Sequence, residues 1–520
     1  MQHTLIIETL SIKDKGYNKR VGTIYKNIAR FIGSKLFFWL TIISFSLQAG
    51  WIAISARYPM AFDEAFHLGI IKIHAEQLSP IITQQPPGMA PYGALTTDPS
   101  YLFHWLMSLP YNLVTNHMSQ FMSQIVTLRL INVAMFAFGL VLFRMVLAKT
   151  KASSASINIA MLFFTLTPVV TLLAAHINYD NLLMPCVAGS LLLTLRFRER
   201  LIDKHQFDSR SLAGVIILSL LASLVKFPFL PILTGVVVYL IYLLFSLSRR
   251  GRKSLHLIKS AKKDWAGVPK WQKLALCIGL VISIGLFSYS YVTNIIVYHN
   301  PVPQCGQVVG IERCQAYGPW ARNHRLAQNI PNDPNIFYFI PNWIGGMFQR
   351  LFFVINSASG PAVYQNFIAP IMAGTAVLGG SIGLFLFFKR ARDNLNRDRA
   401  LTVTLFIMLI YVAALWGRNY HDYLQLGAMV AINGRYMVLI ALPFYLVALI
   451  GWQHWLAGRI RLKLAVFMVA TLLFLQGGGI VSYIAYSNKD WYWPQNTWVQ
   501  AANKSLQKIV KPLVWAPKIR

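Results

Sequence analysis

The chain has 520 residues, of which 56% are hydrophobic and only 12% are charged. Ordinary soluble proteins carry about 25% charged residues, and a disordered chain needs low hydrophobicity, so both classes are excluded. The formal net charge is +31, which in a soluble protein would suggest nucleic acid as a partner. Basic residues also collect in the cytoplasmic loops of membrane proteins. We therefore expect a membrane protein that has no nucleic acid partner.

Long apolar runs predict an all-α polytopic fold with about eleven transmembrane helices, within a range of ten to thirteen. Two further apolar segments, 101–115 and 343–356, are broken by Pro, Gly or polar residues, and we interpret them as helices in or near the outer interface. The expected spans, in chain order, are 36–56, 130–148, 157–175, 181–195, 212–225, 227–247, 274–292, 367–388, 401–416, 436–450 and 464–483.

The distribution of basic residues predicts the orientation. With the N-terminus in the cytoplasm, the inner segments hold 32 of the 48 Lys and Arg residues, although the longest loops are outer ones. This asymmetry favours this orientation and an odd number of spans. The first 35 residues are too long and polar for the start of a signal peptide, so we expect the first span to be an uncleaved anchor. The expected parts are a basic cytoplasmic N-terminus (1–35), a transmembrane domain (36–483) with large outer loops at 57–128 and 293–366, and an extracytoplasmic tail (484–520).

Acidic residues are few and none lies in the middle of an expected span. Transporters usually need ionisable groups at that depth, so a lipid or polysaccharide transporter is the less favoured interpretation. The sequence shows no P-loop and no GxGxxG after a strand. We expect any chemistry at the outer face.

The strongest local signal follows the first span directly. Asp63, Glu64 and His67 come where a helix to about residue 77 is expected to begin, and their spacing can place all three on one helix face. Such a group can hold a general base or a divalent ion such as Mg²⁺ or Mn²⁺. The alternative is that the carboxylates only stabilise the helix N-terminus.

A Pro- and Gly-rich loop over residues 84–93 follows, and it leads to Asp98 and His104. It is either a rigid connector or a loop that lines a substrate site, in which case Asp98 and His104 are the polar contacts. After the third span come Asn178 and Asp180. They are either a helix cap or a second acidic position that lies beside Asp63 and could share a metal with it.

Two of the basic residues that we expect on the outer side lie at the membrane boundary, Lys226 in a tight turn and Arg435 at the start of a span. Each could anchor the chain at the interface. Each could also bind a lipid phosphate, for which Arg offers a planar fork of donors. Cys305 and Cys314 share one outer loop with eight residues between them, which predicts a disulfide in an oxidising compartment.

These motifs resemble the GT-C superfamily of integral-membrane glycosyltransferases, which includes the protein O-mannosyltransferases and the bacterial aminoarabinose transferases. Phe62–His67 resembles the acidic motif of the family's first loop, and Asn178–Asp180 resembles its second acidic position. Lys226–Pro228 and Asn433–Tyr436 are also similar to motifs of a bacterial branch.

The resemblance implies a GT-C-like fold and a sugar donor carried on a polyprenyl phosphate. It implies inverting transfer to a lipid, glycan or protein acceptor at the outer face of the bacterial cytoplasmic membrane. Asp63, Glu64 and Asp180 would be the catalytic acids, and Asp63 and Asp180 the ligands of any metal. His67, Asp98, His104, Asn178, Lys226, Arg435 and Tyr436 would contact the substrate. A surface-glycan ligase or polymerase is a further alternative.

Overall fold

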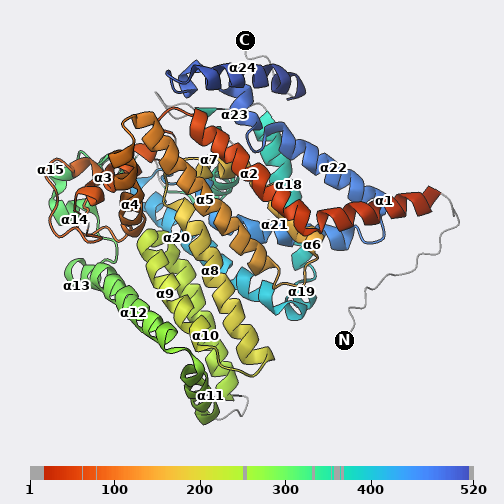
Figure 1. Cartoon of the computed structure of the whole chain (residues 1–520), viewed down its shortest axis with the longest axis horizontal. Coiled ribbons are helices and arrows are strands. Elements are labelled where there is room, and N and C mark those ends of the chain that lie inside the picture. The colour runs from red at the N-terminus through yellow and green to blue at the C-terminus, as the bar shows by residue number, and fades with distance from the viewer. Residues whose placement is uncertain are drawn as a thin grey trace.

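A computed structural model describes residues 17–60, 63–77, 79–249, 254–330, 334–352, 354–355, 363–364 and 368–514. The predicted N-terminal segment 1–35 is thus described only from Tyr17, and Phe62 of the first acidic motif and the last residues of the tail, 515–520, lie outside the described residues. Figure 1 shows a molecule built almost wholly of helices. Within the described residues, the strands are β1 (Val354–Ile355) and β2 (Val363–Tyr364), which pair antiparallel.

Within the described residues, seven helical segments are long and apolar enough to cross a membrane, and an eighth candidate is a pair bent by 72°. The pair is α6 (Ser154–Thr165) and α7 (Pro168–Ala174). The predicted class, an all-α polytopic membrane protein, is confirmed. The seven are α2 (Lys35–Ser55), α5 (Phe121–Leu147), α10 (Leu230–Arg249), α12 (Lys270–Phe287), α20 (Arg399–Leu426), α21 (Arg435–Trp455) and α22 (Ile460–Gly477); α12 continues through η4 (Ser288–Val292) into α13 (Thr293–Tyr298).

The three remaining predicted spans are also helical, as α8 (Asp180–Arg198), α9 (Ser209–Val225) and α18 (Ile368–Phe388). They are shorter in their described apolar part or carry charges at their ends, so the total of eleven spans stays a prediction. Two boundaries differ most from the expectation. α5 begins at Phe121 rather than near residue 130, and α20 runs on to Leu426, so the segment 416–422 is helix rather than loop.

The shorter elements gather at the two ends of the bundle, which we name the outer and inner ends after the predicted orientation. The inner end has α1 (Tyr17–Ile32), η2 (Glu199–Asp203), α11 (Ser254–Gly267) and α19 (Ala391–Arg397). The outer end has α3 (Glu64–Gln77), η1 (Ala90–Tyr92), α4 (Leu102–His117), η3 (Phe227–Phe229), α14 (Cys305–Val309), α15 (Ile311–Cys314), α16 (Gly318–Gln328), α17 (Ile336–Gln349), α23 (Val481–Tyr486), η5 (Lys489–Trp491), α24 (Thr497–Val510) and η6 (Lys511–Leu513).

Segments predicted on one side of the membrane contact one another. At the inner end, Lys149 forms an ion pair with Glu199 at 2.6 Å. At the outer end, the amide of Asn294 donates to the carbonyl of Thr97 at 2.9 Å. In Figure 1, α3, α4, α14 and α15 lie together, far from α11 and α19. The bundle therefore has the two distinct ends that the basic residues predict.

Close helix contacts hold the bundle together where glycines meet a neighbouring backbone. A Cβ atom added to Gly451 of α21 would lie 1.9 Å from the carbonyl oxygen of Gly383 in α18, an impossible contact. Small residues at such positions let membrane helices approach closely. α21 is thereby fixed against α18, and its first residue, Arg435, is held at the outer end.

Candidate active site

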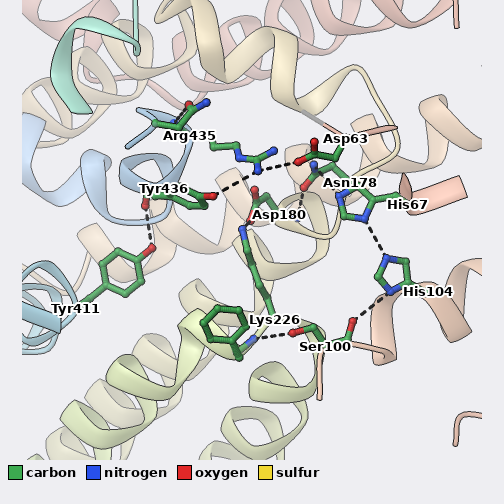
Figure 2. Close-up of polar contacts among 12 residues, drawn as sticks. Asp63, His67, Ser100, His104, Asn178, Asp180, Lys226, Tyr411, Arg435 and Tyr436 are labelled. Carbon is green, nitrogen blue, oxygen red and sulfur yellow. Dashed lines mark hydrogen bonds and ion pairs between the residues drawn. The ribbon is translucent and has the colours of Figure 1, made fainter. Parts of the chain in front are cut away.

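Asp63 lies between α2 and α3, at the outer end of the bundle. Its backbone is in the left-handed region, with φ at 68°, and α3 begins only at the next residue. The Asp63 side chain is 60% exposed, and its Oδ2 accepts a hydrogen bond at 3.0 Å from an Nη atom of Arg435, which is only 9% exposed. Figure 2 shows the two side chains facing each other. The exposed carboxylate is thus held by a buried cation that comes from a distant helix.

The segment Asn433–Tyr436 places this arginine. The side chain of Asn433 accepts a hydrogen bond from the backbone N–H of Arg435 at 3.0 Å. Gly434 passes so close to α17 that a Cβ atom would lie 2.6 Å from the backbone nitrogen of Leu351. The carbonyl of Tyr436 accepts from the Tyr411 hydroxyl at 3.0 Å, and the Tyr436 hydroxyl lies 3.5 Å from the Arg435 guanidinium. Every residue of the motif therefore has a structural task around Arg435.

Lys226 and Asp180 form a second, buried ion pair. The Lys226 Nζ donates to Asp180 Oδ1 at 2.6 Å, and both side chains are nearly inaccessible to solvent. The ammonium also lies over the rings of Tyr179 and Tyr436, at 4.2 and 5.0 Å from their centroids. Lys226 does not snorkel to the membrane surface, because its partner Asp180 at the start of α8 neutralises it inside the protein. Asp180 also interacts electrostatically with Arg435, so the two ion pairs form one cluster.

A chain of hydrogen bonds joins this cluster to the two predicted histidines. His104 Nδ1 lies 3.1 Å from the carbonyl of Ser100, and His104 Nε2 lies 3.0 Å from Nδ1 of His67. His67 Nε2 lies 3.2 Å from the amide nitrogen of Asn178, whose Oδ1 accepts from the backbone N–H of Asp180 at 2.9 Å. Figure 2 follows this chain from Ser100 to Asp180.

The protonation states of His67 and His104 follow from their pKa values and from the acceptor at the Ser100 end of the chain. Burial lowers the pKa of His104 to about 3, and burial, reinforced by the neighbouring His104, lowers the pKa of His67 well below its ordinary value. Both rings are therefore neutral near pH 7. Because the Ser100 carbonyl can only accept, His104 carries its proton on Nδ1, His67 then donates from its own Nδ1, and Asn178 donates to His67 Nε2. His67 and His104 thus orient Asn178, and through it the backbone of Asp180.

Glu64 points away from this cluster. Its two carboxylate oxygens accept from Arg129 of α5 at 2.8 and 2.7 Å, and neither side chain is exposed. The backbone N–H groups of Met60 and Ile177 also donate to it. Burial opposes its ionisation, but Arg129 and these donors bring the pKa of Glu64 below the ordinary value. The geometry gives Glu64 a structural role, because it connects α3, α5 and the loop before α8. The sequence had led us to expect a catalytic role.

The expected metal-binding group is therefore not assembled. Asp63 faces Arg435, Glu64 faces Arg129 and His67 faces Asn178 and His104. Throughout the described part of the chain, no three His, Cys, Asp or Glu side chains lie where they could share a metal ion. Asp180, the second expected ligand, is neutralised by Lys226. These carboxylates do not fit a divalent ion.

Asp98 lies at the Ser100 end of the hydrogen-bonded chain, where its Oδ1 accepts from the backbone N–H of Ser100 at 2.8 Å. Cys305 and Cys314 form the expected disulfide, with their Cα atoms 5.9 Å apart.

The sequence did not lead us to Arg129, although its signal was present, because a single arginine in an apolar run indicates a buried partner. It also did not lead us to Tyr179, whose ring lies under the Lys226 ammonium, or to Tyr411, which donates to the Tyr436 carbonyl, and for these two the sequence holds no comparable signal.

Comparison with known proteins returns no matching family model and no matching curated protein. Among solved structures, the chain is similar to that of ArnT from Cupriavidus metallidurans bound to undecaprenyl phosphate. The two are 13% identical, the match covers 91% of this chain and 70% of the ArnT chain, and the TM-score is 0.43.

Proposed function

We propose that this protein is a membrane glycosyltransferase that moves a sugar from a polyprenyl-phosphate donor to a hydroxyl acceptor. The single observation that carries the proposal is the cluster of Asp63, Arg435, Asp180 and Lys226, an exposed carboxylate backed by two buried cations at one end of a membrane bundle. Sugar transfer needs a base for the acceptor hydroxyl and a group that stabilises the departing phosphate. This cluster supplies both.

The proposed reaction is a single displacement. The acceptor oxygen bonds to the anomeric carbon while the bond from that carbon to the phosphate oxygen breaks, and the polyprenyl phosphate leaves with the bonding electrons. Asp63 takes the acceptor proton, since it is the carboxylate of the cluster that solvent reaches. Arg435 binds the leaving phosphate, and its planar fork suits that role; the buried Lys226, still paired with Asp180, lies behind it.

Asp180 has a different task in this proposal. It is buried against Lys226, and its second oxygen has no hydrogen-bond partner among the described residues. It holds the ammonium in place and, with Tyr179 and Tyr436 beside it, keeps water from the cation. Because the carboxylates do not fit a metal, the two side-chain cations take the place that a divalent ion would have in such a site.

The proposal places the protein in the bacterial cytoplasmic membrane, with this end of the bundle on the extracytoplasmic side, as the basic residues predict. The acceptor class stays open among lipids, glycans and proteins. A transporter is the competing class. It would move a lipid-linked sugar intact, whereas a transferase breaks the bond between sugar and phosphate.

The test uses the full chain in lipid nanodiscs with a radiolabelled polyprenyl-phosphate sugar and extracted membrane glycolipids as acceptors. The expected result is release of undecaprenyl phosphate together with labelled product, both insensitive to EDTA. Asp63→Asn should abolish release, whereas Asp490→Asn, at an exposed carboxylate of the outer end, should not. Recovery of intact donor in every condition, together with its flipping across the bilayer, would assign the protein to the transporters instead.

A further inference from the structure

A pocket lies at the outer end of the bundle, near the cluster. It has a volume of about 260 Å³ and is partly open, and its walls come from the first outer segment, residues 80–101, and from η4 and α13. Asp98 lies in its wall together with Tyr101, Thr293 and Asn294. None of the roles proposed above for the cluster uses this pocket.

The chemistry of the wall excludes several kinds of ligand. The described lining combines apolar side chains of Pro, Ile, Leu and Val with hydroxyl groups of Ser, Thr and Tyr, one amide and one carboxylate, and it contains no Lys, Arg or His. A phosphate or another anion would have no cation there, and Asp98 would repel it. A purely apolar ligand would leave the hydroxyl groups unpaired. The lining therefore suits a neutral ligand with many hydroxyl groups, which is the chemistry of a sugar.

The size agrees with one sugar ring. Pockets for drug-sized ligands measure about 300–1,000 Å³, so a pocket of about 260 Å³ holds a group smaller than these. Burial raises the pKa of Asp98, and a carboxyl group can hydrogen-bond a sugar hydroxyl in either protonation state. An oligosaccharide would not fit inside.

The place of the pocket connects it with both the membrane and the cluster. The α12–α13 segment is a candidate membrane span, and Tyr289 and Val297 on the pocket wall are 44% and 58% exposed. On the other side, Asp98 accepts from the backbone N–H of Ser100 at 2.8 Å, and the Ser100 carbonyl lies 3.1 Å from His104 Nδ1. The pocket thus connects the surface that faces lipid with the histidine end of the hydrogen-bonded chain.

We infer that this pocket binds the sugar ring of a lipid-linked substrate that arrives from the membrane. The identity of the substrate in this inference rests on the proposed function. The binding of a sugar ring in the pocket does not rest on it. The ring could belong to the donor or to a glycolipid acceptor, and both have the same chemistry in the pocket.

The first test measures binding alone, with methyl glucoside, methyl mannoside and methyl galactoside as probes. Saturation-transfer NMR on the full chain in nanodiscs should show saturable binding of at least one glycoside. Thr293→Trp narrows the pocket from its exposed rim and should weaken binding at least fivefold, and Asp98→Asn should weaken it less. Thr234→Trp, at an exposed site of α10 far along the chain, is the matched control and should bind normally.

Absence of saturable binding to all three glycosides, or binding unchanged in both pocket variants, would overturn the inference. Sugar binding without any transfer would leave the pocket in place and reject the proposed function. When transfer is measured, Thr293→Trp should raise one KM at least fivefold. A rise for the acceptor assigns the pocket to the acceptor sugar and a rise for the donor assigns it to the donor sugar, while undecaprenyl phosphate binding should stay unchanged in either case.

Discussion

Asp63→Asn is the substitution that separates chemistry from folding most cleanly in this molecule. Asn tolerates the left-handed backbone that Asp63 adopts at φ 68°, and its amide oxygen can still accept the hydrogen bond that Arg435 donates at 3.0 Å. The Asp63 side chain is 60% exposed, and ion pairs with an exposed member contribute about 0–1 kcal/mol. We therefore expect a change in the free energy of unfolding below about 1 kcal/mol.

The effect on transfer should be much larger. Loss of a general base slows a reaction about 10²–10⁴-fold, which is roughly 2.7–5.4 kcal/mol in activation free energy at about 1.36 kcal/mol per decade. The expected increase in activation free energy is therefore several times the expected decrease in the free energy of unfolding. A variant in which the two changes are equal would show a folding defect and not a missing base.

The assay is the initial rate of sugar transfer in nanodiscs, at saturating donor and with and without EDTA, beside the unfolding temperature of the same preparation. Asp490→Asn is the matched control for the loss of one outer carboxylate. Near wild-type transfer by Asp63→Asn would refute the reasoning and place the base elsewhere. Loss of the wild-type rate in EDTA would also contradict it, because the site is proposed to work through its own cations.

Further variants test the other groups of the site. Arg435→Lys should weaken binding of undecaprenyl phosphate about tenfold, measured by titration in nanodiscs, because an ammonium cannot form the two parallel hydrogen bonds of a guanidinium. Unchanged affinity would show that Arg435 only positions Asp63 and does not bind the phosphate. Glu64→Gln should lower the free energy of unfolding by about 3–5 kcal/mol, because it leaves Arg129 buried without its partner, and chemical denaturation in detergent measures this. Since burial lowers the pKa of His104 from 6.5 to about 3, the free energy of unfolding should be full above pH 6.5 and fall below it, by roughly 3 kcal/mol at pH 4.5. A flat unfolding temperature from pH 7.5 to 4.5 would contradict that assignment.

The membrane helices could be predicted because hydrophobicity is a property of the local sequence. Apolar runs indicated α2 and α21 close to their actual bounds. The distribution of basic residues predicted which loops share an end of the bundle, and loops assigned to one side do contact one another. The boundary of α5 failed for a physical reason. Its first turns contain polar residues and Arg129, which a hydropathy argument rejects although their partners lie inside the protein.

The contacts within the site could not be predicted in the same way. Spacing placed Asp63, Glu64 and His67 on one helix face, and that rule holds only inside a helix. α3 begins at Glu64, and the left-handed backbone of Asp63 turns its side chain toward Arg435. Likewise, nothing in the local sequence says that Lys226 will be buried, because its partner Asp180 lies on another helix.

The two carboxylates of the cluster differ in what they can do, and the difference follows from charge balance. Asp63 and Asp180 together neutralise Arg435 and Lys226, so an arriving phosphate finds a site without net positive charge. It can gain a cation only by displacing a carboxylate. Asp180 is buried and would lose its partner without reaching water, which is unfavourable, whereas the exposed Asp63 can move into solvent or toward an acceptor. Phosphate binding at Arg435 would thus release Asp63 for proton abstraction at the moment when the donor is in place, while Asp180 keeps Lys226 fixed.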